Sequence, residues 1–227
     1  MSDQFPPPLP PPHDDRRTGP VWEQPGPIGS RFLETVRGVL LDPTAFYRTM
    51  RRGAGLGPPL TFGIAGTLIG SLIGSLYQLM FMSAGTGFGD VTAGQAAFAS
   101  LFSSGCIVIV VPVFAVLGMF VGAAIYHVML LLLGAARQPF ETTMRVVAYA
   151  MGATSVLQII PICGSVLAVV WSIVVYIIGL AQAHEIPTGK AAAAVLIPIA
   201  VCCVLTALFY AALLAVFLGA AFGGLQQ

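Results

Sequence analysis

Long apolar runs separated by short polar stretches fill the chain from about residue 60 to residue 222. A helix needs about 20 consecutive apolar residues to cross the hydrocarbon core of a bilayer. The pattern therefore predicts five membrane-spanning helices, at about 60–82, 105–133, 142–160, 164–183 and 191–222. The third and fourth are joined by "IPICGS", which leaves room only for a tight turn, so they should form a helical hairpin. The predicted fold class is all-α, a polytopic membrane helical bundle.

The polar start of the chain predicts two further regions. Residues 1–29 are Pro-rich, and proline at this density lacks the donors for a helix or a sheet, so we expect a disordered cytoplasmic tail. Residues 30–52 alternate charged and bulky side chains at helical spacing, and Phe46 and Tyr47 lie in the second half of that stretch. The pattern predicts short amphipathic helices, which either lie in the headgroup layer of a membrane or pack on the rest of the protein.

Composition supports the membrane assignment. Only 8% of the residues are charged and 57% are hydrophobic, whereas a soluble domain carries about a quarter charged residues. The net charge of +1 gives no electrostatic footprint for nucleic acid. No nucleic-acid partner is therefore predicted, and membrane lipid is the expected surrounding of the bundle.

The distribution of Lys and Arg predicts the orientation. These residues lie before the first span, between the second and third (Arg137 and Arg145), or between the fourth and fifth (Lys190). With five crossings all three places lie on one side of the membrane, and an excess of Lys and Arg marks the cytoplasmic side. We expect a cytoplasmic N-terminus, an outside C-terminus, and residence in the inner membrane if the protein is bacterial.

The charged stretch between the second and third spans has two interpretations. Glu141 lies near a predicted helix start, where it complements the helix dipole, and it stands four residues before Arg145 in the favourable order. Arg145 is expected to bury its stem and extend its charge to the interface. The stretch then sets orientation only. Alternatively it forms a cytoplasmic docking face for a protein partner, together with Phe46, Tyr47, Arg137 and Lys190.

Polar residues inside the spans are few. His127 lies in the second span and Gln158 in the third, and intramembrane polar groups are costly enough to suggest a role. No carboxylate lies deep in a span to share proton transfer with His127. A neutral imidazole hydrogen-bonded to a neighbouring helix is the main expectation, with proton or metal work as the alternative.

Glycines at four-residue spacing predict close helix contacts. Gly66, Gly70 and Gly74 repeat in the first span, and Gly118 and Gly122 repeat the spacing in the second. Such small-residue faces let helices approach backbone to backbone. They serve either internal packing or a homo-oligomer formed through the first span.

No catalytic, metal or cofactor site is predicted, and we do not expect an enzyme. The stretch "HEIPT" has Thr188 where a zinc protease helix needs its second His, and the four cysteines lack metal spacing. Cys106 and Cys163 should both lie near the outer face, where a disulfide is an open alternative to two free thiols.

Several stretches taken in order resemble a known family. The residues "LGAARQPFETTMRVVAYAMGATSVLQIIPICG", "IGLAQAH" and "KAAAAVLIP", with "LLDPTAFY" ahead of the first span, resemble the Yip family of Ypt/Rab-interacting, five-span membrane proteins in its bacterial form. The resemblance implies five spans, a cytosolic N-terminus and an outside C-terminus. Eukaryotic members are tied to Rab GTPases and vesicle traffic, a role that would lack its partner in a bacterium.

Two functions are consistent with these patterns. The first is a non-enzymatic scaffold or adaptor in membrane organisation or trafficking, which uses the N-terminal helices and inner loops to bind a cytoplasmic partner or organise lipid. The second is a small solute or ion permease or channel, with His127 and Gln158 along its path.

Overall fold

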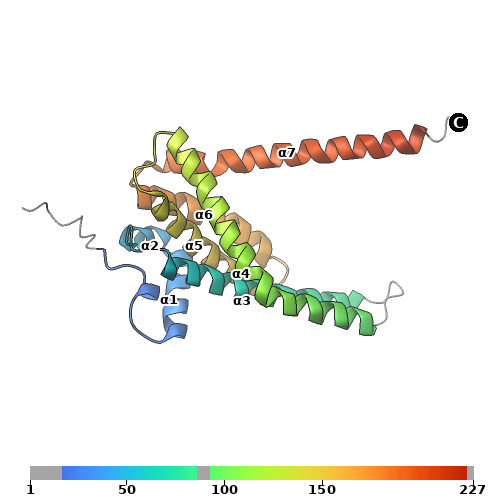
Figure 1. The fold of residues 1–227 in the computed structure, drawn as a ribbon, viewed down its shortest axis with the longest axis horizontal. Coiled ribbons are helices and arrows are strands. Elements are labelled where there is room, and N and C mark those ends of the chain that lie inside the picture. Colours follow the sequence, from blue (N-terminus) through green and yellow to red (C-terminus); the bar gives the residue numbers. More distant parts are fainter. Residues whose placement is uncertain (1–16, 86–92, 224–227) are drawn as a thin grey trace, which may run out of the picture.

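The computed structural model describes residues 17–85 and 93–223, without the side chains of 78, 79, 81–85, 93–108 and 216–223. The residues that it describes form helices, turns and loops (Figure 1). The elements are the short 3-10 helices η1 (Val21–Glu23) and η2 (Val156–Ile159), and the α-helices α1 (Ile28–Leu41), α2 (Pro43–Thr49), α3 (Gly57–Gly85), α4 (Ala93–Leu132), α5 (Phe140–Ser155), α6 (Gly164–His184) and α7 (Thr188–Gly223). The all-α prediction is confirmed.

Four of these helices are long and apolar enough to cross a membrane. The qualifying stretches are Gly57–Tyr77, Ile109–Leu132, Gly164–His184 and Thr188–Ala215, in α3, α4, α6 and α7. The predicted span at 142–160 corresponds to α5 and η2, but α5 has only 16 residues. At 1.5 Å per residue it is about 24 Å long, against about 30 Å for the hydrocarbon core. The chain is thus a multi-pass membrane bundle, with four candidate spans where five were predicted.

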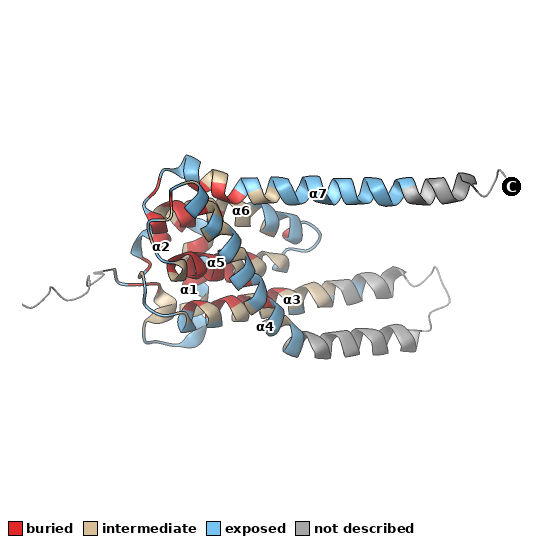
Figure 2. Ribbon diagram, turned by 45° about the horizontal axis from the view of Figure 1, so that its top comes forward, coloured by how far each residue is buried: buried red, intermediate tan, exposed pale blue. Residues whose placement is uncertain are grey.

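Helix α5 is the centre of the bundle. It contacts α3, α4, α6 and α1, and every residue from Thr142 to Ala150 is buried (Figure 2). Through η2 and a tight turn it forms the predicted hairpin with α6, against which it packs. The turn holds Ile162 at a φ of +69°, an uncommon conformation for a β-branched residue.

Glycines set the closest contact of the bundle, between α3 and α5. A Cβ atom added to Gly66 would collide with the carbonyl oxygen of Gly152, and one added to Gly70 would collide with that of Ser155. The backbones of the two helices therefore touch along this face. Gly122 on α4 is different, because an added Cβ would lie 3.8 Å from Val147, which is an ordinary contact. Gly118 has similar space, so the second glycine pair does not mark a close backbone approach.

One end of the bundle carries a folded cap. Figure 1 shows α1 running across the direction of α3, with α2 beside it. α1 packs on α5 and α2 packs on α6, and the side chains of Val36, Val39 and Met50 are buried there. Their apolar faces therefore pack on the protein. We call this the capped end.

Helix α7 leaves the bundle after three turns. Ala191, Ala194 and Val195 are buried against α4 and α6, whereas every residue from 200 to 215 is exposed. Both views show its outer part standing apart from the other helices (Figures 1 and 2). Apolar side chains on such a helix face lipid in a membrane.

Candidate functional site

The three basic stretches of the sequence meet at the capped end. Arg17 and Arg52 both reach the carboxylate of Glu185, at 3.0 and 2.6 Å. Arg137 donates to the backbone oxygen of Glu185 at 2.9 Å, and Lys190 donates to the backbone oxygen of Leu133 at 3.4 Å. Arg52, through its hydrogen bond and its charge, holds the pKa of the exposed Glu185 carboxyl below its usual range, and the charges of Arg17 and Arg137 add to this effect. Residues separated along the chain thus form one charged surface.

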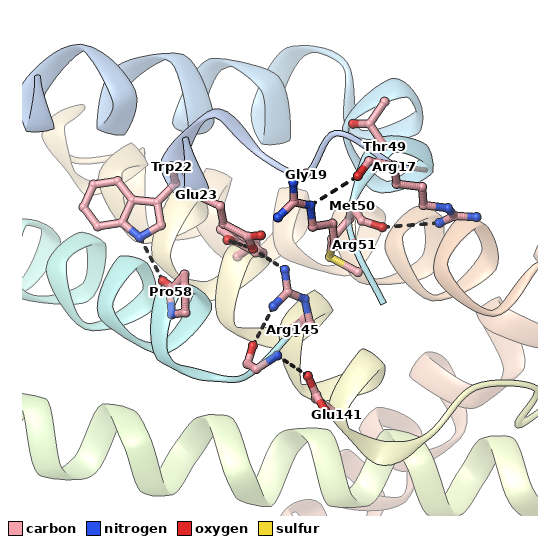
Figure 3. A network of polar contacts seen from close by, with 12 residues as sticks. Arg17, Gly19, Trp22, Glu23, Thr49, Met50, Arg51, Pro58, Glu141 and Arg145 are labelled. Carbon is pink, nitrogen blue, oxygen red and sulfur yellow. Dashed lines mark hydrogen bonds and ion pairs between the residues drawn. The ribbon is translucent and has the colours of Figure 1, made fainter. Parts of the chain in front are cut away.

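Arg145 lies under this surface and is fully enclosed. Its side chain is 0% exposed and that of its ion-pair partner Glu23 is 6% exposed. The same guanidinium donates to the backbone oxygen of Gly55 at 2.6 Å (Figure 3). The expectation that Arg145 extends to the interface is therefore wrong, because its counter-charge comes to it inside the protein.

Two further contacts lie next to this ion pair, the first partly buried and the second exposed. The hydroxyl of Tyr149, one turn further along α5, donates to the same Glu23 oxygen at 2.7 Å. The carboxylate of Glu141 accepts the N–H of Gly55 at 2.7 Å. Glu141 and Arg145, expected to pair with each other, instead hold the two polar groups of Gly55. The result is a polar cluster in which Glu23 receives two hydrogen bonds, one of them charge-assisted.

Glu23 reaches the site because the segment before α1 is docked. We call residues 17–26 the arm. The N–H of Gly19 donates to the backbone oxygen of Thr49 at 3.1 Å, and the indole N–H of Trp22 donates to that of Pro58 at 2.8 Å. The guanidinium of Arg31 donates to the backbone oxygens of Trp22 and Gln24, at 3.1 and 2.7 Å.

The predicted disordered tail at 1–29 is therefore wrong for residues 17–29, since the arm is docked and α1 begins at Ile28. Residues 1–16, which include the densest proline run, lie outside the described residues. The physical reason for the difference is that the arm holds Trp22 and Glu23, side chains with specific partners elsewhere in the fold.

The predicted docking face needs correction at three positions. Phe46, Tyr47 and Arg145 are buried. The Tyr47 hydroxyl lies 3.4 Å from the backbone oxygen of Val146, and burial raises the pKa of Tyr47 well above its usual range. Of the other candidates, Arg137 and Lys190 are exposed and Glu141 is half-buried.

A second polar cluster joins α4, α5 and the end of α6. His184 Nδ1 accepts the N–H of Gln138 at 3.3 Å, so in the neutral ring the proton is on Nε2. That N–H donates to the hydroxyl of Thr143 at 3.0 Å, and the hydroxyl can then donate to His127 Nδ1 at 2.9 Å. His127 is thus hydrogen-bonded to a neighbouring helix. In the part of the chain that the structure describes, no group of three His, Cys, Asp or Glu side chains could hold a metal ion.

Gln158 lies at the other end of α5, away from His127. It lines a cavity of about 200 Å³ together with Gly74, Tyr77, Ile160, Ile162 and Ser165. The Tyr77 hydroxyl donates to the backbone oxygen of Ile159 at 2.6 Å beside it. Cys163 is exposed in the adjacent turn, while the side chain of Cys106 lies outside the description, so their pairing stays a prediction.

Sequence reasoning missed Glu23, Trp22, Thr143 and His184. The pair "WE" inside a Pro-rich segment was a usable signal, because a large aromatic residue is unusual in a solvated tail. His184 ends the apolar run "IGLAQAH", where a buried imidazole needs a partner. Nothing in the local sequence indicated which residues these groups would contact.

Comparison with known proteins gives one match. A model of the family described as the Yip1 domain matches residues 37–209. No curated protein and no solved structure matches the chain. The matched stretch begins within α1 and ends within α7, so the arm with Glu23 lies before it.

Proposed function

Because the chain belongs to the Yip1 domain family, we propose that this multi-pass membrane protein is a non-enzymatic scaffold or adaptor in membrane organisation or trafficking. Its capped end is the docking face for a cytoplasmic protein partner. The observation that carries this proposal is the cap itself, a folded polar layer on one end of an apolar bundle.

The docking face differs from the one that the sequence suggests. It consists of the exposed residues Arg137 and Lys190 together with the outer face of α1, which exposes Leu33, Arg37 and Leu41. These residues combine positive charge with apolar side chains. Such a mixture suits a protein partner or the headgroup layer, and membrane lipid beside the cap is part of the proposal.

The proposal includes five crossings and a cytoplasmic cap. In this arrangement α5 with η2 is the additional crossing, the third in chain order, which is enclosed by the other helices. An odd number of crossings leaves the two chain ends on opposite sides. The excess of Arg and Lys at the capped end supports a cytoplasmic location for that end, with the C-terminus outside and the inner membrane as the site in a bacterium.

A permease or channel is the alternative function, and its proposed path has less support. His127 is hydrogen-bonded to Thr143, and Gln158 lines a cavity near the opposite end of α5. Among the described contacts none joins the two groups. A homo-oligomer through α3 also loses support, since Gly66 and Gly70 face α5.

Site-specific photo-crosslinking in native membranes tests the docking face. Crosslinkers are placed at Leu41, which is 76% exposed on the cap, and at Gln138, in the loop before α5, whose N–H contacts His184. The matched control is Ile162, which is 85% exposed at the opposite end. We expect one defined protein at Leu41 and Gln138 and not at Ile162. Capture of lipid alone at the cap, or the same proteins at all three positions, contradicts the adaptor and directs the next test to liposome flux.

A further inference from the structure

We propose that the buried site around Arg145 binds an acidic, aromatic peptide segment, which the arm supplies within the chain and a partner protein supplies when the arm is released. This inference rests on the proposed docking function and names the chemistry of the partner. The site has two halves. One is the anion half, made by Arg145, Tyr149 and Gly55, and the other is the aromatic half, which holds Trp22.

The anion half requires a negative charge. Arg145 is completely buried, and its Nε has no hydrogen-bond partner among the described residues. The nearby carboxylate of Glu141 is committed to the N–H of Gly55. A guanidinium at this depth is unfavourable without a counter-charge. Glu23 supplies this counter-charge. It lies before residues 37–209, the stretch that the family model matches.

The aromatic half selects a flat side chain next to the acid. Trp22 lies edge-on to Phe32 and Phe62, with ring centroids 6.2 and 5.6 Å apart. Its indole N–H donates to Pro58, and the guanidinium carbon of Arg31 lies 5.5 Å from the centre of its ring. Because Trp22 and Glu23 are adjacent in the sequence, the two halves of the site bind two neighbouring side chains of one peptide.

The arm has the properties of a bound ligand. Its only regular structure is the three-residue helix η1, and it is joined to α1 by a short link in which Gly26 has a φ of +153°, a conformation that favours glycine. It precedes the matched family domain. The arm is held by individual contacts such as Glu23 with Arg145 and Trp22 with Pro58, without a long helix of its own, and such segments open more readily than the core of a fold. Release of the arm would expose Arg145 and the aromatic half together.

A peptide fits both halves, whereas a lipid phosphate would fit only one. A phosphate could replace the Glu23 carboxylate between Arg145 and Tyr149. It would leave the contacts of the indole ring with Phe32, Phe62 and Pro58 unmade. The charge and the shape of the site together therefore favour an acidic residue preceded by an aromatic one.

The test uses the full chain in nanodiscs of neutral phosphatidylcholine and a fluorescent peptide with the sequence of residues 17–27, "RTGPVWEQPGP". Peptide binding is followed by fluorescence anisotropy. The wild-type protein should bind weakly, since its own arm competes. Glu23→Gln in the protein removes the charge that holds the arm on Arg145 and should tighten binding about tenfold or more, because the free fraction of the site rises. Glu34→Gln, on the exposed face of α1, is the matched control and should leave the affinity unchanged.

Variants of the site and of the peptide test the recognition itself. On the Glu23→Gln background, Tyr149→Phe removes one hydroxyl and should weaken binding about fivefold, with the helical circular dichroism unchanged. A peptide with Gln in place of its Glu should bind about tenfold more weakly than the acidic peptide. Equal binding of the two peptides, or no gain from Glu23→Gln, would overturn the proposal.

The lipid composition of the nanodisc distinguishes a headgroup phosphate from a peptide carboxylate as the anion that Arg145 binds. If nanodiscs with phosphatidylglycerol abolish peptide binding to Glu23→Gln, a headgroup phosphate is the better ligand and the peptide proposal is wrong. Retained binding supports it. The crosslinking at Leu41 and Gln138 reports on the outer surface of the cap. A defined partner there without peptide binding would overturn only this inference, and peptide binding without such a partner would overturn only the outer docking face.

Discussion

Helices α5 and α7 reverse the rule that apolar residues lie inside a protein. α5 carries Glu141, Arg145 and several threonines and is the most enclosed helix of the bundle, while the almost purely apolar α7 is exposed along its outer part (Figure 2). In water the burial of the two would be exchanged. In lipid, the burial of apolar surface gains little free energy, whereas polar groups need hydrogen-bond partners within the protein. Burial in this chain therefore follows hydrogen bonding and close contact more than hydrophobicity.

The largest effect is expected when the same residue type is truncated on both helices. Tyr149 on α5 is 0% exposed and packs between Phe46 and Phe62, whereas Tyr210 on α7 is 64% exposed. Tyr149→Ala should destabilise the protein by about 3–5 kcal/mol, through the cavity and the lost hydroxyl contact. Tyr210→Ala should cost less than about 0.5 kcal/mol. Reversible unfolding in detergent measures both, and similar values would contradict the burial difference.

A second prediction concerns the backbone contact of α5 with α3. Gly66→Ala places a methyl group against the backbone of Gly152, which cannot move aside as a side chain does. We expect a loss of about 3 kcal/mol, at the upper end for overpacking. Gly122→Ala on α4 is the control, because its methyl group would meet Val147 at 3.8 Å, and it should stay within about 1 kcal/mol of the wild type. A fully stable Gly66→Ala would show that the helices are further apart than the structure places them.

Two neighbouring threonines on α5 separate the effect of hydrogen bonding from the effect of burial. Thr143 and Thr142 are both buried on α5, but only Thr143 bridges His127 and His184, while the Thr142 hydroxyl has no hydrogen-bond partner among the described residues. Thr143→Val should cost about 1–3 kcal/mol, since two imidazole nitrogens lose their partner. Thr142→Val keeps the shape and should be neutral or slightly stabilising. Equal effects of the two substitutions on the unfolding midpoint would contradict a stabilising role for the hydrogen bonds of Thr143.

The smallest effect is expected at the surface of the cap. The folded-state pKa of Glu185 is lowered by Arg52 and its neighbours, so its contribution to stability is present above the unfolded pKa of about 4.3 and is lost as pH falls through the folded value. For an exposed pair this contribution is below about 1 kcal/mol. The stability difference between wild type and Glu185→Gln should be constant from about pH 7 to 5 and shrink below about 4.3. If the stability difference between wild type and Glu185→Gln stays unchanged at acidic pH, the charge of Glu185 does not contribute to stability.

Much of the fold could be predicted from the sequence, because the relevant signals are local. Apolar runs gave the four long helices, and "IPICGS" gave the turn between α5 and α6. The spacing of Gly66 and Gly70 indicated a close contact, although it could not say which helix would face them. The order of weak motifs gave the family, which the match over residues 37–209 confirms.

The candidate site could not be predicted, because its partners are distant along the chain. Arg145 and Glu23 are 122 positions apart, and the nearest acid in the sequence, Glu141, suggested a local pair instead. Local reasoning also placed Phe46 and Tyr47 on an exposed face, since it could not foresee that α2 packs on α6. A charged residue in the middle of "MRVVAYA" shows that a partner is required, and only the fold shows which one.

The separation of Glu23 from Arg145 along the chain also delays the formation of their ion pair during synthesis. A ribosome adding about 5–20 residues per second completes the 122 positions between them in roughly 6–24 s. During that interval α1 to α4 are made, and the Glu23 carboxylate has neither Arg145 nor Tyr149 to contact. Arg145 in turn enters the nascent bundle when its counter-charge has already been synthesised. A chain shortened past Glu23 would leave Arg145 on α5 without its counter-charge, so the arm belongs in any expression trial of the membrane domain.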